Sequence, residues 1–168
     1  VAEMQIPSLA ALGNISRSFA EMRVNVRSYL LATNAADQAK AMAMFTEDET
    51  EFARLLQQYA DALISDDRDR RLFNDFRDSS REWIAGAKQV MALSEEGRQD
   101  EAKALLSGAV VQIAGRLSQE SREWIQHNDQ LAATAGKAAV KGTENSLREM
   151  LIANRAVLLV TALLGWLT

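Results

Sequence analysis

Residues 8–33, SLAALGNISRSFAEMRVNVRSYLLAT, decide the fold. Apolar side chains recur in this stretch at steps of three and four residues, which places them on one face of an α-helix. No alternation of apolar and polar residues suggests a strand. The stretch therefore predicts a long amphipathic helix that ends near Asn34. The residues of its apolar face are Leu9, Leu12, Ile15, Phe19, Met22, Val26, Leu30 and Thr33.

The same period restarts three times toward the C-terminus. Three turns separate the helical stretches, at residues 33–37 (TNAAD), 65–69 (SDDRD) and 95–97 (EEG). Asparagine, serine and aspartate in the first two turns are residues that cap a following helix. The apolar positions of the second, third and fourth predicted helices are Phe45, Phe52, Leu55, Leu56, Tyr59 and Leu63, then Leu72, Phe76, Trp83, Ala87 and Val90, then Leu106, Val110, Ile113, Leu117, Trp124, Leu131 and Val140.

Four helices joined by three turns predict an all-α, antiparallel up-down-up-down four-helix bundle. The fourth helix has no clear stop after Gln99 and needs nearly 60 residues to reach Ala156, whereas the first has only 34 residues before its turn. A partner of matching length needs about 20 more residues at ~1.5 Å each, so we expect the intact protein to continue upstream of Val1. In the fourth helix, Gly136 and Gly142 are expected to permit close helix approach.

The chain ends in an uncharged apolar run at residues 156–168, AVLLVTALLGWLT. A spanning helix needs ~20 residues to cross ~30 Å of hydrocarbon, so these 13 residues are too short to span and instead predict the start of a transmembrane helix. A C-terminal core helix is the alternative. We therefore divide the chain into a bundle domain at residues 1–155 and a membrane segment at residues 156–168.

Composition excludes several functions. The chain carries 19 Lys and Arg against 23 Asp and Glu, so it has no basic excess for nucleic acid. It contains no cysteine, which excludes disulfides and thiolate metal sites. The single histidine, His127, has no second histidine with which to form a metal motif, and we expect it to be solvated at the surface. We predict no catalysis, no metal and no cofactor.

Two arginines are the strongest candidates for a binding site. Arg23 and Arg27 are four residues apart on one helical face, with Arg17 lower and on a different side. Guanidinium groups bind carboxylates in a bidentate manner, and a second subunit would bring the same surface across a two-fold axis. The alternative is that these arginines are solvated or paired with neighbouring helices.

The chain resembles the four-helix-bundle sensor domains of bacterial methyl-accepting chemotaxis proteins. In the first helix the resemblance rests on Ile6-Pro7-Ser8, Leu12, Ile15 and the stretch Arg23-x-x-x-Arg27-x-Tyr29-Leu30-Leu31. In the third and fourth helices it rests on Phe76, Trp83 and Glu96-Gly97-Arg98-Gln99-Asp100-Glu101-Ala102. The trailing apolar run strengthens it.

This resemblance implies a homodimeric, periplasmic module anchored in the inner membrane, with a small ligand at the dimer interface near the membrane-distal end. Arg23 and Arg27 match the second and third arginines of the aspartate-receptor pattern. The first falls on Ser18, one position from Arg17, and no threonine opens the fourth helix. The resemblance thus favours a carboxylate over an amino acid. Further candidate contacts are Tyr29, for which a core role is the alternative, and Ser107, Gln112 and Arg116.

Three functional hypotheses follow. The first is a chemoreceptor sensor for a small organic acid, such as malate, citrate, benzoate or quinate, in which ligand binding shifts the fourth helix. The second is the same type of bundle serving as the input domain of a membrane histidine kinase or cyclase. The third is a structural bundle or tether without a ligand.

Overall fold

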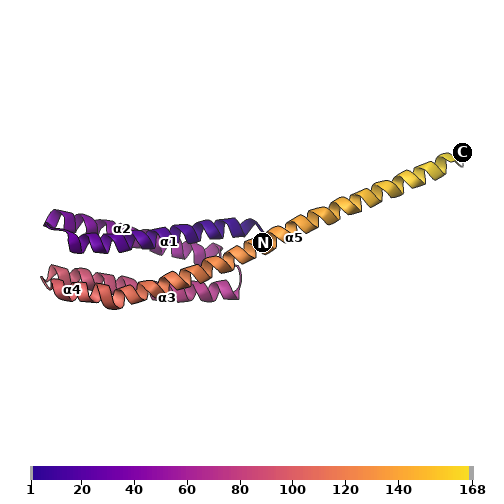
Figure 1. Cartoon of the computed structure of the whole chain (residues 1–168). Helices are drawn as coiled ribbons and strands as arrows, with labels where there is room; N and C mark the ends of the chain where they lie inside the picture. The colour runs from indigo at the N-terminus through magenta and orange to yellow at the C-terminus, as the bar shows by residue number, and fades with distance from the viewer. Residues whose placement is uncertain (1, 167–168) are drawn as a thin grey trace.

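The computed structural model describes the backbone of residues 2–166 and the side chains of residues 7–138, 140, 141 and 150. All its regular elements are helical, which confirms the predicted all-α bundle. They are α1 (Ala2–Leu31), α2 (Ala35–Ala62), α3 (Asp67–Glu95), α4 (Gln99–Leu105), the π-helical segment η1 (Leu106–Val110) and α5 (Val111–Trp166). Because α4, η1 and α5 follow one another without a break, they form the fourth helix of the bundle (Figure 1).

Each turn has a local physical cause. The side chain of Asn34 accepts a hydrogen bond from the Asp37 backbone N–H at 2.9 Å and caps α2. Asp66 caps α3 in the same way, accepting from the Asp69 N–H at 2.7 Å. Gly97 has a φ of +78°, a left-handed conformation that glycine adopts without strain. The α1–α2 and α3–α4 turns lie together at the bundle end remote from the N-terminus, which we call the distal end (Figure 1).

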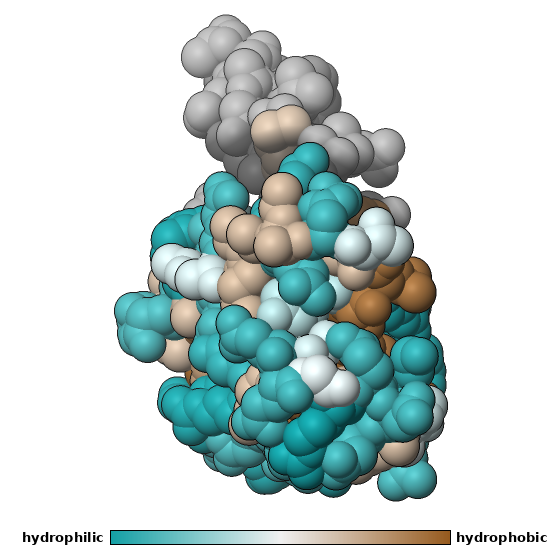
Figure 2. Space-filling view, turned by 90° about the vertical axis from the view of Figure 1, so that its left-hand side faces the viewer, coloured by the Kyte–Doolittle hydropathy of each residue, from teal (hydrophilic) through white to brown (hydrophobic). Residues whose placement is uncertain are grey.

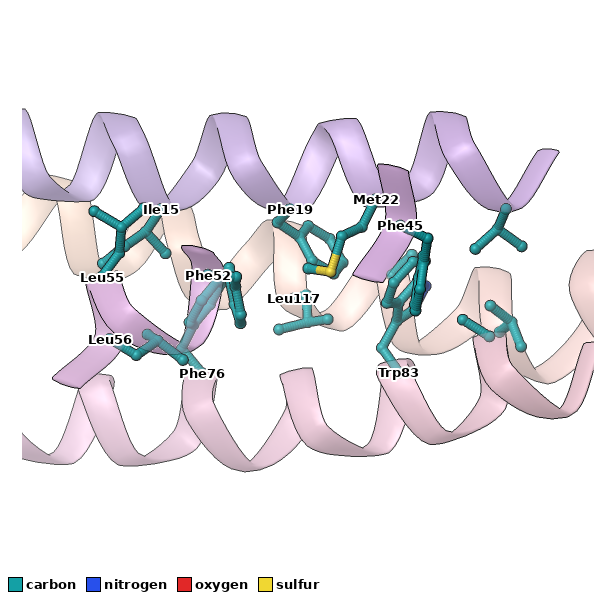
Figure 3. Packing of buried hydrophobic residues seen from close by; sticks show 14 of the residues in the cluster. Ile15, Phe19, Met22, Phe45, Phe52, Leu55, Leu56, Phe76, Trp83 and Leu117 are labelled. Carbon is teal, nitrogen blue, oxygen red and sulfur yellow. The ribbon is translucent and has the colours of Figure 1, made fainter. Parts of the chain in front are cut away.

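Most residues of the predicted apolar faces lie in or against the core, but Thr33 and Val140 are exposed, and the core also contains Phe73 and Met91, which were not predicted. Its centre is aromatic, with the rings of Phe19 and Trp83 meeting edge to face at a centroid distance of 4.8 Å. Figure 3 shows Phe19, Phe52, Phe76 and Trp83 pointing inward between the helices. Fully burying a large apolar side chain contributes about 1.5–3 kcal/mol, so these residues hold the bundle together.

Some pairs of helices pack closely against each other and others do not. α1 contacts α2 and α5 along much of its length, and α3 packs on α4, η1 and α5. By contrast, α2 and α3 touch only sparsely. The side chains between α2 and α3 therefore line a groove that is open to solvent.

The fourth helix differs from the prediction in two respects. Its register is interrupted by η1, because the backbone widens to π geometry where the sequence pattern suggested a continuous α-helix. The close approach expected at Gly136 is not found among the described residues, since a Cβ atom there would meet none of their atoms within 4 Å. The close approach occurs instead at Gly86 in α3, where a Cβ would lie 3.0 Å from Cγ2 of Val110. Gly142 lies outside the residues whose side chains are described.

At the other end, α5 continues alone beyond the bundle (Figure 1). Val140 is 61% exposed there, since no other helix of the described residues packs against it. Within the described part of the chain, no helix contains a stretch long and apolar enough to cross a membrane. The apolar run at residues 156–168 lies outside the residues whose side chains are described, so its membrane role stays a prediction.

Candidate ligand-binding site

Arg23 and Arg27 lie side by side near the distal end of α1, at its seam with the fourth helix. Their side chains, together with Trp83 of α3, cover a small cavity of about 10 Å³. A cavity of this size holds a single water molecule at most, so a ligand must approach the arginines from outside. The fourth-helix residues that line the cavity are Leu106, Val110, Val111 and Ala114.

The charges of these two arginines are not neutralised within the described residues. Neither guanidinium forms an ion pair with a described carboxylate. The guanidinium of Arg23 lies over the ring of Phe19, 6.0 Å from its centroid, and Arg27 is exposed. The structure thus keeps both cations available to an external anion.

A second hollow of about 280 Å³ follows the same seam away from the distal end. Arg23 lines it together with three serines, Ser16, Ser118 and Ser121. The hydroxyl oxygens of Ser16 and Ser121 lie 3.2 Å apart, which joins α1 to α5. Sequence reasoning missed these serines because nothing local indicates which residues of two distant helices will face each other.

Arg17 does not join the other two arginines. It is exposed, and its charge acts on Glu51 of α2, on the other side of α1. The pKa of Glu51 is lowered first by hydrogen bonds from Arg54 and to a smaller extent by Arg17. The structure therefore leaves Arg17 outside the Arg23 and Arg27 site.

Tyr29 lies in the core. Its side chain is only 3% exposed, and burial, with a smaller contribution from the charge of Glu95, raises the pKa of its hydroxyl. Of the two roles considered for Tyr29, the geometry fits the core aromatic, because a ligand at the surface cannot reach a side chain buried this deeply.

The three candidates on the fourth helix are dispersed. Ser107 is exposed and donates its hydroxyl to its own helix, at the carbonyl of Lys103. Gln112 is exposed and lines neither hollow. Arg116 turns toward α3, where it forms an ion pair with Glu82. The helix period explains this, since Arg116 lies two residues, and thus about 200°, beyond the cavity residue Ala114.

The expectation for His127 was wrong. Its side chain is only 7% exposed, and Nε2 lies 3.0 and 3.1 Å from the two carboxylate oxygens of Asp66. Burial pushes the pKa of Asp66 up, but hydrogen bonds from the Asp69 backbone N–H and from His127 outweigh it and hold this pKa below its ordinary value. His127 is buried because α5 packs against the α2–α3 turn.

Asp69, next to this pair, is a fully buried acid that sequence reasoning treated only as a turn residue. Its carboxylate accepts hydrogen bonds from side chains of α2 and α5. A signal was present, because Asp69 precedes Phe73 and Phe76 at the steps of four and three that mark the buried face of α3. The donors are the hydroxyls of Tyr59 and Ser65, the Ser65 backbone N–H, the Trp124 indole and the Asn128 amide.

The chemistry of the arginine seam comes from basic and hydroxyl side chains. The seam presents guanidinium and hydroxyl groups, and within the described residues no three His, Cys, Asp or Glu side chains converge as they would around a metal. The fold defines an all-helical, bundle-type module.

A model of one protein family, described as the four-helix-bundle sensory module for signal transduction, matches residues 2–142. The chain therefore belongs to this family, the sensory modules of methyl-accepting chemotaxis proteins. No individually curated protein matches the chain.

Proposed function

We propose that this chain is the sensor domain of a chemoreceptor that binds a small organic acid at the seam of α1 and α5. The observation that carries the proposal is the pair Arg23 and Arg27, two adjacent cations without a described carboxylate partner in a chain of net charge -4. Guanidinium groups bind carboxylates through two parallel hydrogen bonds. Membership of a sensory family supports a ligand as the stimulus.

The seam also favours a homodimer, with the ligand between the two copies. Val24 on α1 and Val111 on α5 flank the arginines and are 58% and 46% exposed, although both are large apolar residues. A second copy related by a two-fold axis would cover them. It would also enclose the ligand, since the cavity within one chain is too small to do so.

The serines of the neighbouring hollow widen the range of ligands that the site could bind. The hydroxyl oxygens of Ser118, which donates its hydrogen to the Ala114 carbonyl, and of Ser121, which shares a hydrogen bond with Ser16, supply acceptors next to Arg23. A dicarboxylate or tricarboxylate such as malate or citrate would use both arginines. A hydroaromatic acid such as quinate would place its carboxylate on the arginines and its hydroxyls on the serines.

Signalling follows from the continuity of the fourth helix. A ligand that binds one arrangement of α5 better than another shifts the population toward it. α5 runs from the arginine site out of the bundle, so it carries a displacement away from the site (Figure 1). We place the bundle in the periplasm and residues 156–168 in the inner membrane, in agreement with the apolar run.

The test is thermal unfolding of the whole chain with malate, citrate, benzoate, quinate and aspartate. A ligand at about 100 times its dissociation constant adds ~2.7 kcal/mol of stability. We expect one carboxylate to stabilise the wild type and to have no effect on the Arg23→Gln, Arg27→Gln double variant. Arg54→Gln, which removes an exposed arginine of α2, is the matched control and should respond as the wild type does.

A flat response from the wild type at concentrations where it is dimeric would contradict the proposal and favour the tether. An equal response from the double variant would contradict the site. The input domain of a histidine kinase or cyclase is distinguished by the cytoplasmic sequence that follows the membrane segment in the whole gene.

A further inference from the structure

A second candidate site lies in the groove between α2 and α3. The groove has a volume of about 530 Å³, within the range of ~300–1,000 Å³ that is typical of small-molecule pockets. It shares no lining residue with the two hollows of the arginine seam. The groove therefore forms a separate surface of the bundle.

Small side chains create this groove. Ala53 and Ala60 face it from α2, and Ser80 and Ala85 face it from α3, where larger residues would fill the space between the helices. Beneath them lie Phe52 and Phe73, which belong to the core. The groove consequently has an apolar, partly aromatic floor.

Its rim is positively charged. α3 contributes Arg77, Arg81 and Lys88, and the lining contains one carboxylate, Glu49, which accepts a 2.7 Å hydrogen bond from Lys88. Of these cations, Arg77 already lies beside the floor, with its guanidinium 5.7 Å from the centroid of the Phe73 ring. An aromatic surface and a guanidinium thus meet at one point of the groove.

Asp78 is the competing anion at this rim. Arg77 and Arg81 both contact it, with nitrogen–oxygen distances of 2.9 and 3.6 Å. The side chains of Asp78 and Arg81 are 61% and 71% exposed. Exposed ion pairs of this kind contribute little, about 0–1 kcal/mol, so a ligand carboxylate can take the place of Asp78 on Arg81.

We propose that the α2–α3 groove binds a small amphipathic acid with an aromatic body. The ring packs against Phe52 and Ala53 beside Ile84, and the carboxylate binds Arg77 and Arg81. The ligand carboxylate neutralises positive charge at the rim. The ring fills the groove, whose volume is too small for a peptide helix. The site does not depend on the proposed function of the arginine seam.

The whole chain is titrated with 2-naphthoate. Binding is measured by calorimetry and by NMR of the isoleucine methyl groups. 2-Naphthalenemethanol, which has the same rings without the charge, is the matched ligand. We expect saturable binding of 2-naphthoate with contacts between its ring protons and the Ile84 methyl groups, and at least tenfold weaker binding of the alcohol. Ile84 is half-buried and lines the groove.

Variants assign the binding to the groove. Ala85→Leu fills the groove from α3 and should abolish binding. Ala53→Leu fills it from α2 and should have the same effect. The second variant keeps the test valid if the first one perturbs the fold. Arg81→Gln should weaken binding at least tenfold, whereas Arg27→Gln at the other site should leave it unchanged. The proposal is overturned if both leucine variants bind like the wild type, if the alcohol binds as tightly as the acid, or if Arg27→Gln removes the binding.

Discussion

The indole Nε1 of Trp124 donates a 2.6 Å hydrogen bond to Oδ1 of Asp69, which joins α5 to α3 inside the bundle. The same carboxylate accepts bonds from the hydroxyls of Tyr59 and Ser65. Three helices and the α2–α3 turn thus meet at one buried acid in the first turn of α3. We call Asp69 and its donors the carboxylate clamp.

We predict that a conservative substitution of Asp69, the acid of the carboxylate clamp, strongly lowers the free energy of unfolding. Asp69→Asn keeps the shape of the side chain but sets an amide donor against the donors around it. We expect a loss of about 2–3 kcal/mol in the free energy of unfolding, because hydrogen bonds to a charged group are strong and buried donors lose their partner. Urea denaturation followed by tryptophan fluorescence measures it. Asp61→Asn, at an exposed site of α2, should cost less than about 0.5 kcal/mol; equal losses would contradict the clamp.

Glu120 predicts a pH dependence. Burial raises the pKa of its carboxyl, assisted by Asp75 and Glu123 and opposed by Ser79 and Arg116, and its Oε2 has no described hydrogen-bond partner. The folded state therefore holds this proton more tightly than the unfolded state. The resulting stability is present at low pH and is lost as the pH rises from the unfolded pKa through the raised folded pKa.

Glu120→Gln should remove this dependence. At pH 7 we expect the variant to be more stable than the wild type by up to about 1 kcal/mol, since no charge has to be buried. Melting temperatures between pH 4 and pH 7 should fall less with rising pH in the variant. Asp129→Asn, at an exposed position of α5 whose charge is not among those that shift the pKa of Glu120, should leave the pH profile unchanged. A Glu120→Gln variant that is less stable than the wild type at pH 7 would rule out this account of Glu120.

Gly97 and Gly136 predict opposite effects of the same substitution. Gly97→Ala places a Cβ atom on a left-handed backbone and should destabilise the chain by about 1–2 kcal/mol. Gly136→Ala lies in a helix with open space around it and should be neutral or stabilising by up to about 1 kcal/mol. Thermal unfolding of both variants checks the pair, and losses of the same size would show that the turn does not depend on glycine.

The dimer predicted at the α1–α5 seam can be tested by cross-linking. The chain contains no cysteine, so a single engineered cysteine reports on one position. Val24→Cys should form intermolecular disulfides readily under mild oxidation, because the same residue would face its copy near the two-fold axis. Thr46→Cys, at an exposed position of α2, should cross-link much more slowly. Equal rates would place the interface elsewhere.

The helices and their ends were predictable because their causes are local. The steps of three and four residues that contain Phe19 and Met22 encode a buried face, and Asn34 and Asp66 cap the helices that follow them. The pairing of Arg23 with Arg27 on one face was predictable for the same reason.

Other features depend on the register between distant helices. Whether His127 is solvated depends on the α2–α3 turn about sixty residues earlier, where it meets Asp66. The serines at positions 16 and 121 face each other across the bundle, 105 residues apart in sequence. The groove between α2 and α3 arises from small residues on two helices at once, and no single stretch of sequence indicates it.

The π-helical segment Leu106–Val110 sets the phase of everything that follows it. A π turn accommodates one residue more than an α turn at the same place. Returning it to α geometry would therefore turn the downstream helix by about 100° about its axis, or advance it by about 1.5 Å. α5 is continuous from Val111 to Trp166. A rotation or shift of the helix beside Arg23 and Arg27 would therefore move its far end by the same angle or distance.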